Sequence, residues 1–177
     1  MSRLPTPQSI LRKAKNWSDF TRLISSVHDK KRKGDVFELH IKFHLELSPV
    51  YASKLAKVWL LHEAPKKIHD RLNLPDADEG IDLIAQTDTG EYWVIQSKYR
   101  SDENASLTRT ELSTFTDLAF GICRHIRLGL VCTPTNRISY MRIDLVLFRV
   151  TRGDHSTKTS SEMVGLGYVG KAIASSH

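Results

Sequence analysis

Two short apolar segments joined by a turn motif constrain the fold of this chain more than any other feature. Ile81 to Ala85 and Tyr92 to Ile95 are rich in β-branched and aromatic residues, which favour strands. Asp88-Thr89-Gly90 lies between them, and supplies the side-chain cap and the positive-φ residue that a hairpin connection needs. The sequence therefore predicts two antiparallel strands joined by a tight turn.

Polar residues interrupt this apolar hairpin. Asp82 lies within the first strand, where burial of a carboxylate costs several kcal/mol unless a cation or a hydrogen-bond donor compensates. Gln96 and Lys98 lie at the end of the second strand, with Ser97 between them. Because alternate residues of a strand share a face, Gln96 and Lys98 point the same way. The pattern predicts that a carboxylate faces an amide oxygen and an ammonium group.

This set of groups is suited to a hard divalent metal. Mg²⁺ binds oxygen ligands and keeps several waters, so the Asp82 carboxylate, the Gln96 amide oxygen and the Ser97 backbone carbonyl would suffice. A bound metal lowers the pKa of its water, and Lys98 can orient that water or stabilise charge on a phosphate. Hydrolysis of a phosphodiester is the chemistry that the arrangement favours.

A family resemblance rests on these same residues. Asp82 followed by Gln96-Ser97-Lys98 resembles the PD-(D/E)xK nuclease superfamily, and within it the Mrr-like restriction endonucleases, whose second motif is commonly Gln-x-Lys. The segment from Lys57 to Pro65 is further similar to the N-terminal nuclease domains of helicase-coupled, type ISP-like restriction enzymes. The resemblance covers about Lys33 to Thr135.

The resemblance implies a metal-dependent endonuclease that hydrolyses double-stranded DNA with Mg²⁺, for which Mn²⁺ can substitute. It implies an α/β fold with a restriction-endonuclease-like core of the αβββαβ type, in which helices flank a central mixed sheet. The implied partners are helicase or methyltransferase domains, or subunits, of the same restriction or defence system; a homodimer is left open. A glutamine in place of the usual acid removes one negative charge, so metal affinity should be weaker.

An additional acid, Glu38, has two interpretations. It lies near the start of a predicted helix, where a carboxylate is favoured by the helix dipole. The segment Lys33 to Glu38 also resembles the Lys-Gly-x-x-Phe-Glu context in which the nuclease family places an acid on its first core helix. That resemblance implies that Glu38 completes the metal site, directly or through water.

Composition is consistent with a basic globular protein. The 177-residue chain carries a formal net charge of +6, which fits a polyanionic partner. No apolar run is long enough for a membrane helix and the first residues lack a signal-peptide pattern, so a prokaryotic cytoplasmic location without a membrane partner is expected. Cys123 and Cys132 do not have a metal-ligand spacing, and buried reduced thiols are expected.

Hydrophobic periodicity predicts the order of elements. A helix is expected from Trp17 to near Asp29 with Ser18 or Asp19 as N-cap, and residues 30–150 are assigned to the nuclease core, between an extension at 1–29 and a polar tail at 151–177. Lys30-Lys31-Arg32-Lys33 is either a solvated linker or a contact with the DNA backbone. The core is expected to contain helices at 34–47 and 108–122, the latter opened by a Thr108-x-x-Glu111 capping box, and strands at 128–132 and 143–150.

Other motifs and other functions were weighed. His40 and His44 have an i, i+4 spacing that can bind zinc, but no third ligand stands out and a structural role is favoured. Asp78 is a weaker candidate for an acid near the metal. The Gly-x-Gly-x-x-Gly pattern at 165–170 lacks the room for a dinucleotide-binding unit and is rejected. A DNA-binding module without cleavage, or a junction-resolvase-like nuclease, would explain much of the same pattern.

Overall fold

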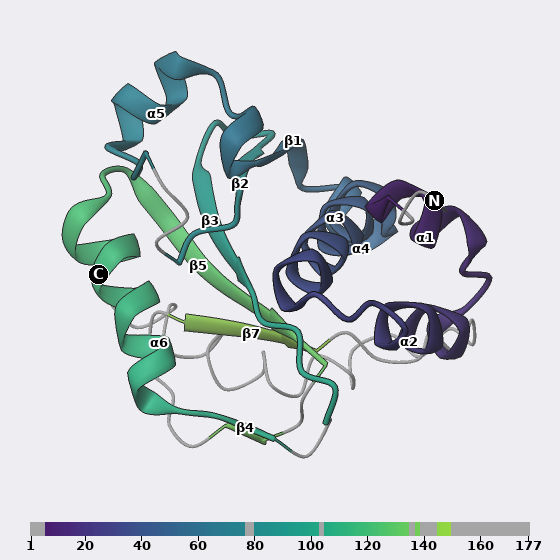
Figure 1. The fold of residues 1–177 in the computed structure, drawn as a ribbon. Coiled ribbons are helices and arrows are strands. Elements are labelled where there is room, and N and C mark those ends of the chain that lie inside the picture. Colours follow the sequence, from purple (N-terminus) through teal and green to yellow (C-terminus); the bar gives the residue numbers. More distant parts are fainter. Residues whose placement is uncertain (1–5, 77–79, 103–104, 135–136, 139–144, 150–177) are drawn as a thin grey trace.

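Five strands form one mixed sheet in the order β1-β2-β3-β5-β7 (Figure 1). The computed structural model describes residues 6–76, 80–102, 105–134, 137–138 and 145–149. The strands of the sheet span Leu55–Leu60 (β1), Leu83–Thr87 (β2), Tyr92–Ser97 (β3), Ile126–Thr133 (β5) and Leu145–Arg149 (β7). A second, two-stranded sheet pairs Ser106–Leu107 (β4) with Arg137–Ile138 (β6).

The predicted hairpin lies at the centre of the sheet. β2 pairs antiparallel with β3, with Leu83 opposite Ile95, and β1 pairs antiparallel with the other edge of β2. β5 runs parallel to β3, which requires a crossover, and the helix between them supplies it. β7 continues the sheet parallel to β5 and lies within the strand predicted at 143–150. The observed αβββαβ order confirms the predicted fold class.

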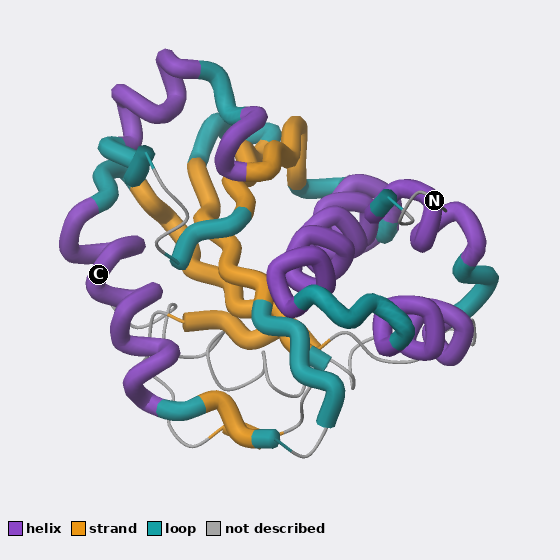
Figure 2. Tube along the Cα trace, viewed as in Figure 1, coloured by secondary structure: helices purple, strands orange, loops and turns teal. Residues whose placement is uncertain are grey.

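Helices cover both faces of the sheet (Figures 1 and 2). One core packs α1 (Pro7–Lys13), α2 (Trp17–Ser25), α3 (Lys30–Leu47) and α4 (Pro49–Ala52) against Leu83, Ile95 and Cys132. The other core packs α5 (Lys66–Leu72) and α6 (Arg109–Thr116) against Ile84, Val94 and Val131. Neighbouring residues of a strand contribute to opposite cores, as the period of two requires. β3 is thus covered on both sides.

Helix boundaries in the first third of the chain differ from the sequence-based expectation. α2 begins at Trp17 with Asn16 as N-cap, because the Asn16 side chain accepts the Asp19 N–H at 2.9 Å, and it ends at Ser25 rather than near Asp29. Asp29 instead caps α3 by accepting from the N–H groups of Lys31 and Arg32. The basic cluster at 30–33 therefore forms the first turn of α3, which argues against the solvated-linker alternative.

The crossover helix begins as predicted and ends differently. Thr108 and Glu111 form a capping box at the start of α6, with the Thr108 N–H donating to the Glu111 carboxylate at 2.9 Å. After Thr116 the chain widens into a π-helical turn, η2 (Asp117–Ile122). A 3₁₀ turn, η1 (Leu61–Glu63), follows β1 directly. Asp78, the tail after residue 150 and the glycine pattern at 165–170 lie outside the described residues.

Candidate nuclease site

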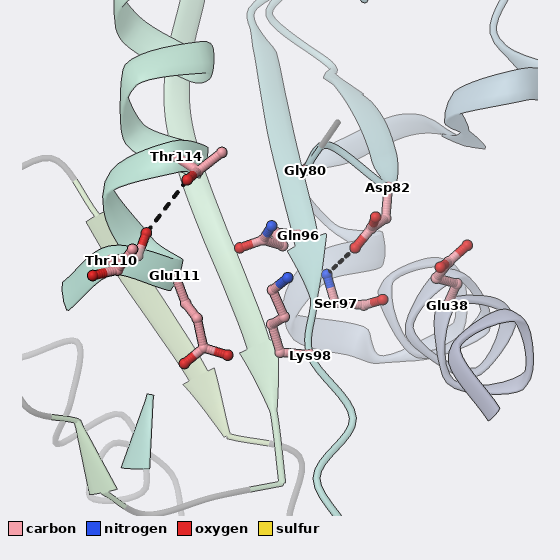
Figure 3. Close-up of a pocket in the computed structure, with 9 residues that line it drawn as sticks. All are labelled: Glu38, Gly80, Asp82, Gln96, Ser97, Lys98, Thr110, Glu111 and Thr114. Atoms are coloured by element: carbon pink, nitrogen blue, oxygen red, sulfur yellow. Dashed lines mark hydrogen bonds between the residues drawn. The ribbon is translucent and has the colours of Figure 1, made fainter. Parts of the chain in front are cut away.

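A cleft of about 640 Å³ opens at the end of β3, between α3 and α6. Figure 3 shows the residues that line it: Glu38, Gly80, Asp82, Gln96, Ser97, Lys98, Thr110, Glu111 and Thr114. Every residue assigned to the site from the sequence is in this set. They come from α3, from the residues that lead into β2, and from the end of β3. The cleft lies where β3 and β5 end side by side, next to the pair Ser97 and Cys132.

Asp82 is held in place by the backbone around it. It lies directly before β2; its N–H donates to Ile95 O at 2.9 Å and its carbonyl accepts from Leu61 N at 2.8 Å. The carboxylate accepts the Ser97 N–H at 2.5 Å, and only 8% of the residue is exposed. Burial raises the pKa of the Cys132 thiol in β5, and the negative charge of Asp82 raises it further. The predicted burial of an acid in the hairpin is confirmed.

Gln96 is almost fully buried, at 2% exposure. Its Oε1 atom accepts no hydrogen bond within the described part of the chain, although a buried acceptor without a partner is costly. In Figure 3 that oxygen points toward α6, while the amide nitrogen faces Gly80. Gly80 has φ +119°, and a Cβ there would lie 3.2 Å from this nitrogen, so the approach to β2 requires glycine for both reasons.

Ser97 and Lys98 complete the floor of the cleft. The Lys98 N–H donates to Cys132 O at 2.8 Å, which extends the pairing with β5 one residue past the end of β3. In Figure 3 the Lys98 side chain turns back so that its nitrogen lies between the side chains of Gln96 and Ser97. Its ammonium group forms no ion pair with any described residue. A cation is thus available beside the buried amide.

Glu38 reaches the cleft from α3, on the side of β3 where Asp82 lies (Figure 3). It is half-buried in the third turn of the helix, one turn beyond Gly34, whose ideal Cβ position is 3.8 Å from Glu38 Oε1. The helix starts four residues earlier than expected, so Glu38 is not in its first turn. The interpretation of Glu38 as a first-turn acid that serves only the helix dipole is therefore wrong.

Three residues of α6 that sequence reasoning did not assign to the site form the opposite wall: Thr110, Glu111 and Thr114. The sequence predicts Glu111 only as a capping residue of this helix, and its carboxylate does cap the start of α6. Its Oε1 atom also accepts from the Arg100 guanidinium. The capping box was the only signal in the sequence, and it places Glu111 on a helix without showing that the helix faces β3.

The charges of the cleft fit a divalent cation. Three carboxylates line it, from Glu38, Asp82 and Glu111, against one ammonium, from Lys98. Carboxylate and amide oxygens are ligands that Mg²⁺ prefers, and the buried Gln96 oxygen is an acceptor that a cation would satisfy. Among the described residues no three His, Cys, Asp or Glu side chains are grouped as a metal site. An amide in place of a third acid is consistent with that finding.

The two histidines of α3 lie elsewhere. His40 packs against the rings of Trp17, Phe20 and Phe37, at centroid distances of 5.7, 4.5 and 6.2 Å. Burial, and to a lesser degree the neighbouring His44, lowers the pKa of His40 to about 4. These contacts favour the structural role over zinc binding. Cys123 and Cys132 are both buried free thiols, as expected.

Fold and site together define a class of protein. A mixed αβββαβ sheet that presents Asp82 and a Gln-x-Lys pair at one strand end is a restriction-endonuclease-like nuclease core. Residues 46–146 match a family model of the Mrr catalytic type that is described as a restriction endonuclease. Because this match spans more than half of the 177 residues, the chain belongs to that family of nucleases.

One solved structure has the same fold. An "ATP-dependent Type ISP restriction-modification enzyme LlaBIII bound to DNA" superposes with a TM-score of 0.53 over 90% of this chain, at 14% sequence identity. The chain spans only 9% of the length of that enzyme. Comparison with the curated proteins gives no match. Among the described residues, no helix is both long and apolar enough to cross a bilayer.

Proposed function

We propose that this chain is a divalent-metal-dependent endonuclease that hydrolyses DNA phosphodiester bonds within a restriction or defence system. The observation that carries the proposal is the meeting of Asp82, Gln96, Lys98 and Glu38 in one cleft. These residues were singled out from separate segments of the sequence. A non-catalytic domain has no need for a buried acid, an unpaired buried amide oxygen and a free ammonium in one place.

We assign the metal, Mg²⁺ or Mn²⁺, to Asp82, Gln96, the Ser97 carbonyl and Glu38. The bound ion would neutralise charge on the phosphate and make its water more acidic. The Asp82 and Glu38 carboxylates lie on one side of β3 in Figure 3, so both can face the ion. Gln96 presents its oxygen after a half-turn of the amide, which exchanges oxygen and nitrogen without moving the rest of the side chain.

Lys98 is assigned to the attacking water and the scissile phosphate. Its ammonium group can donate to the water and to a phosphate oxygen, and so hold both in position for attack. In the transition state it stabilises the added negative charge inside a partly closed cleft, where electrostatic interactions are stronger than in bulk water. Lys98 accepts no proton in this assignment; it orients and stabilises.

The partner assigned here is double-stranded DNA. The basic first turn of α3, Lys30 to Lys33, precedes Glu38 on the same helix, so its cations can contact the backbone near the cleft. The net charge of +6 supports a polyanionic partner. Because the superposed type ISP enzyme is ATP-dependent and far longer than this chain, we also propose that helicase and methyltransferase units act with this nuclease.

A plasmid assay tests the proposal. Supercoiled DNA is incubated with and without Mg²⁺ or Mn²⁺, and nicked and linear products are measured. Asp82→Ala and Lys98→Ala should each lower the rate by at least about 100-fold, because each removes a group that acts on the reacting phosphate. Asp88→Ala and Lys67→Ala are the matched controls, since Asp88 is exposed in the hairpin turn and Lys67 is an exposed residue of α5.

Each alternative has its own outcome. Cutting that survives both cleft substitutions would show that the site is assigned wrongly. Intact DNA binding without cutting, together with calorimetry that detects no Asp82-dependent binding of Mg²⁺, would favour the non-cleaving module. A stable dimer in solution that prefers branched DNA to linear duplex would favour the resolvase-like nuclease.

A further inference from the structure

An ion pair borders the cleft on the side away from Asp82. The Arg100 guanidinium donates through Nη2 to Glu111 Oε1, and the two side chains are 31% and 29% exposed. Arg100 lies in the loop after β3, and Glu111 lies in the first turn of α6. Within the described part of the chain this is the only hydrogen bond of the guanidinium. Its other N–H groups are therefore available to a ligand.

Glu111 is rigidly anchored. Its Oε2 atom accepts from Thr108 N and from Thr108 Oγ1, both at 2.9 Å, and the Glu111 N–H donates back to Thr108 Oγ1 at 3.3 Å. One carboxylate oxygen thus fixes the start of the helix, and the other holds the arginine. Arg100 loses part of its side-chain freedom before any ligand arrives, which reduces the entropic cost of binding.

The cleft also needs a second cation. Three carboxylates and only one ammonium line it, so a DNA strand that enters meets a net negative surface. A metal ion offsets part of this charge at Asp82 and Glu38, on one side of β3. On the other side, Arg100 is the one described residue that forms an ion pair with Glu111.

We propose that Arg100 binds the phosphate next to the scissile one in the DNA strand, and that Glu111 is the positioning residue for this arginine. The inference rests on the proposed function, because it takes the scissile phosphate to lie at Lys98. Arg100 follows Lys98 by two residues, so at most about 7 Å of extended chain separates their Cα atoms. That reach suits neighbouring phosphates. The planar guanidinium can give two parallel hydrogen bonds to a phosphate while Nη2 keeps Glu111.

Salt-dependent binding tests the arginine. Binding of a short labelled duplex is followed by fluorescence anisotropy over a series of salt concentrations, with metal chelated so that no DNA is cut. Arg100→Ala should weaken binding by about tenfold and reduce the slope of log K against log salt by about 0.9, the value for one lost phosphate contact. Arg100→Gln, which can still hydrogen-bond Glu111, should give the same loss and guards against a folding defect.

A matched control exists at the opposite end of the sheet. Arg127 is an exposed arginine paired with Glu91 at 3.4 Å, near the start of β5 and away from the cleft. Arg127→Ala removes the same charge and the same kind of ion pair. Its salt slope should equal that of the wild-type protein.

The role of Glu111 is tested through its coupling to Arg100. Glu111→Gln keeps an oxygen that accepts from Thr108 but removes the charge that holds the guanidinium. It should weaken DNA binding in the wild-type background and have no effect in the Arg100→Ala background. A merely structural glutamate would give the same change in both backgrounds, and a merely repulsive one would tighten binding in both; either result would overturn the positioning role.

The possible failures can be told apart. A protein that binds and cuts DNA but keeps its salt slope in Arg100→Ala would overturn the phosphate contact and leave the nuclease intact. If the wild-type protein does not cut DNA but Arg100→Ala reduces the salt slope, the phosphate contact is supported and the proposed nuclease activity is overturned. Absence of salt-dependent binding by the wild-type protein would overturn the contact whatever the plasmid assay shows.

Discussion

Gln96 is the residue on which the chemistry of the cleft depends most directly. At 2% exposure it is buried as deeply as the apolar residues around it, and its oxygen lacks a partner among the described residues. An amide can either point its oxygen at a metal or its nitrogen at Gly80. A carboxylate at the same position would present an oxygen in both orientations and would add a negative charge. In the proposed metal site, the glutamine would therefore limit metal affinity through both charge and orientation.

Gln96→Glu should make the metal-free protein less stable and should increase its affinity for Mg²⁺. A second carboxylate beside Asp82 in a buried site should lower the free energy of unfolding by about 1 to 3 kcal/mol when metal is chelated. Mg²⁺ should then raise the melting temperature more in the variant than in the wild-type protein, because binding to the folded state alone stabilises it. Thermal melts with chelator and with Mg²⁺ measure both effects.

Gln96→Met is the control for that experiment, since it keeps the volume and the flexibility of the side chain but offers no oxygen. It should show a smaller Mg²⁺-induced shift than the wild-type protein. Equal shifts in the glutamate and methionine variants would mean that position 96 does not bind the ion. The assignment of Asp82 would then need a different partner on β3.

At the scale of single residues, the sequence predicted which side chains meet but not how they point. Asp82, Gln96 and Lys98 could be placed together because strand alternation and the hairpin turn are local properties. Glu111 could not, since its position across the cleft depends on how the crossover returns the chain parallel to β3. The orientation of the Gln96 amide involves Gly80, which lies close to the amide nitrogen. The positive φ of Gly80 could not be predicted from the local sequence.

At the scale of elements, the prediction succeeded where strong local signals exist and failed at helix ends. The capping box of α6 and the short strand at 128–132, which lies within β5, were found from the sequence. The start of α3 was expected at residue 34, after the basic cluster, whereas Asp29 caps the helix and places those four residues in its first turn. The π-helical turn η2 was not predicted, and its Phe120 ring packs closely on β5, where a Cβ on Gly129 would lie only 3.1 Å from the ring.

Gly129→Ala should therefore destabilise the protein by about 1 to 3 kcal/mol, as overpacking of a filled core does. The added methyl group would approach Phe115 Cε1 at 3.2 Å as well, and Phe115 is fully buried and cannot yield easily. Chemical denaturation measures the change. The control is Gly121→Ala in η2, where no atom lies within 4 Å of the added Cβ and φ is ordinary.

Gly121→Ala should be neutral or stabilising by up to about 1 kcal/mol, because it restricts the unfolded chain. If both alanine variants lose the same stability, the close contact between Phe120 and β5 is not what fixes the turn.

In the whole molecule, the two cores on either side of β3 support different parts of the cleft. The core with α5 and α6 supports the wall that carries Glu111 and the side chains of Gln96 and Lys98. The core with α1 to α3 positions Glu38, and it contains the buried ring cluster around His40. Because Glu38 and His40 are on the same helix, the stability of this core bears on the geometry of the cleft. The stability of that core should also depend on pH, through His40.

His40 should make the protein less stable below neutral pH. Burial lowers the pKa of His40 to about 4 in the folded protein, against an ordinary value of 6.5. Above pH 6.5 the imidazole is neutral in both states and has no effect. As pH falls from 6.5 toward 4 the unfolded chain takes up a proton that the folded protein does not, so stability is lost. Between pH 7.5 and 5 the loss should be about 2 kcal/mol.

The measurement is urea denaturation of wild-type protein and His40→Phe across this pH range. Phenylalanine retains an aromatic ring against Phe20 and Trp17 and carries no titratable group. The stability of the variant relative to the wild type should rise by about 2 kcal/mol between pH 7.5 and 5, because only the wild type loses the His40 contribution. A difference that does not change with pH would mean that His40 is protonated as easily in the folded core as in the unfolded chain. In that case the ring cluster would have to open to water, and the position of Glu38 on the same helix would not be fixed by packing.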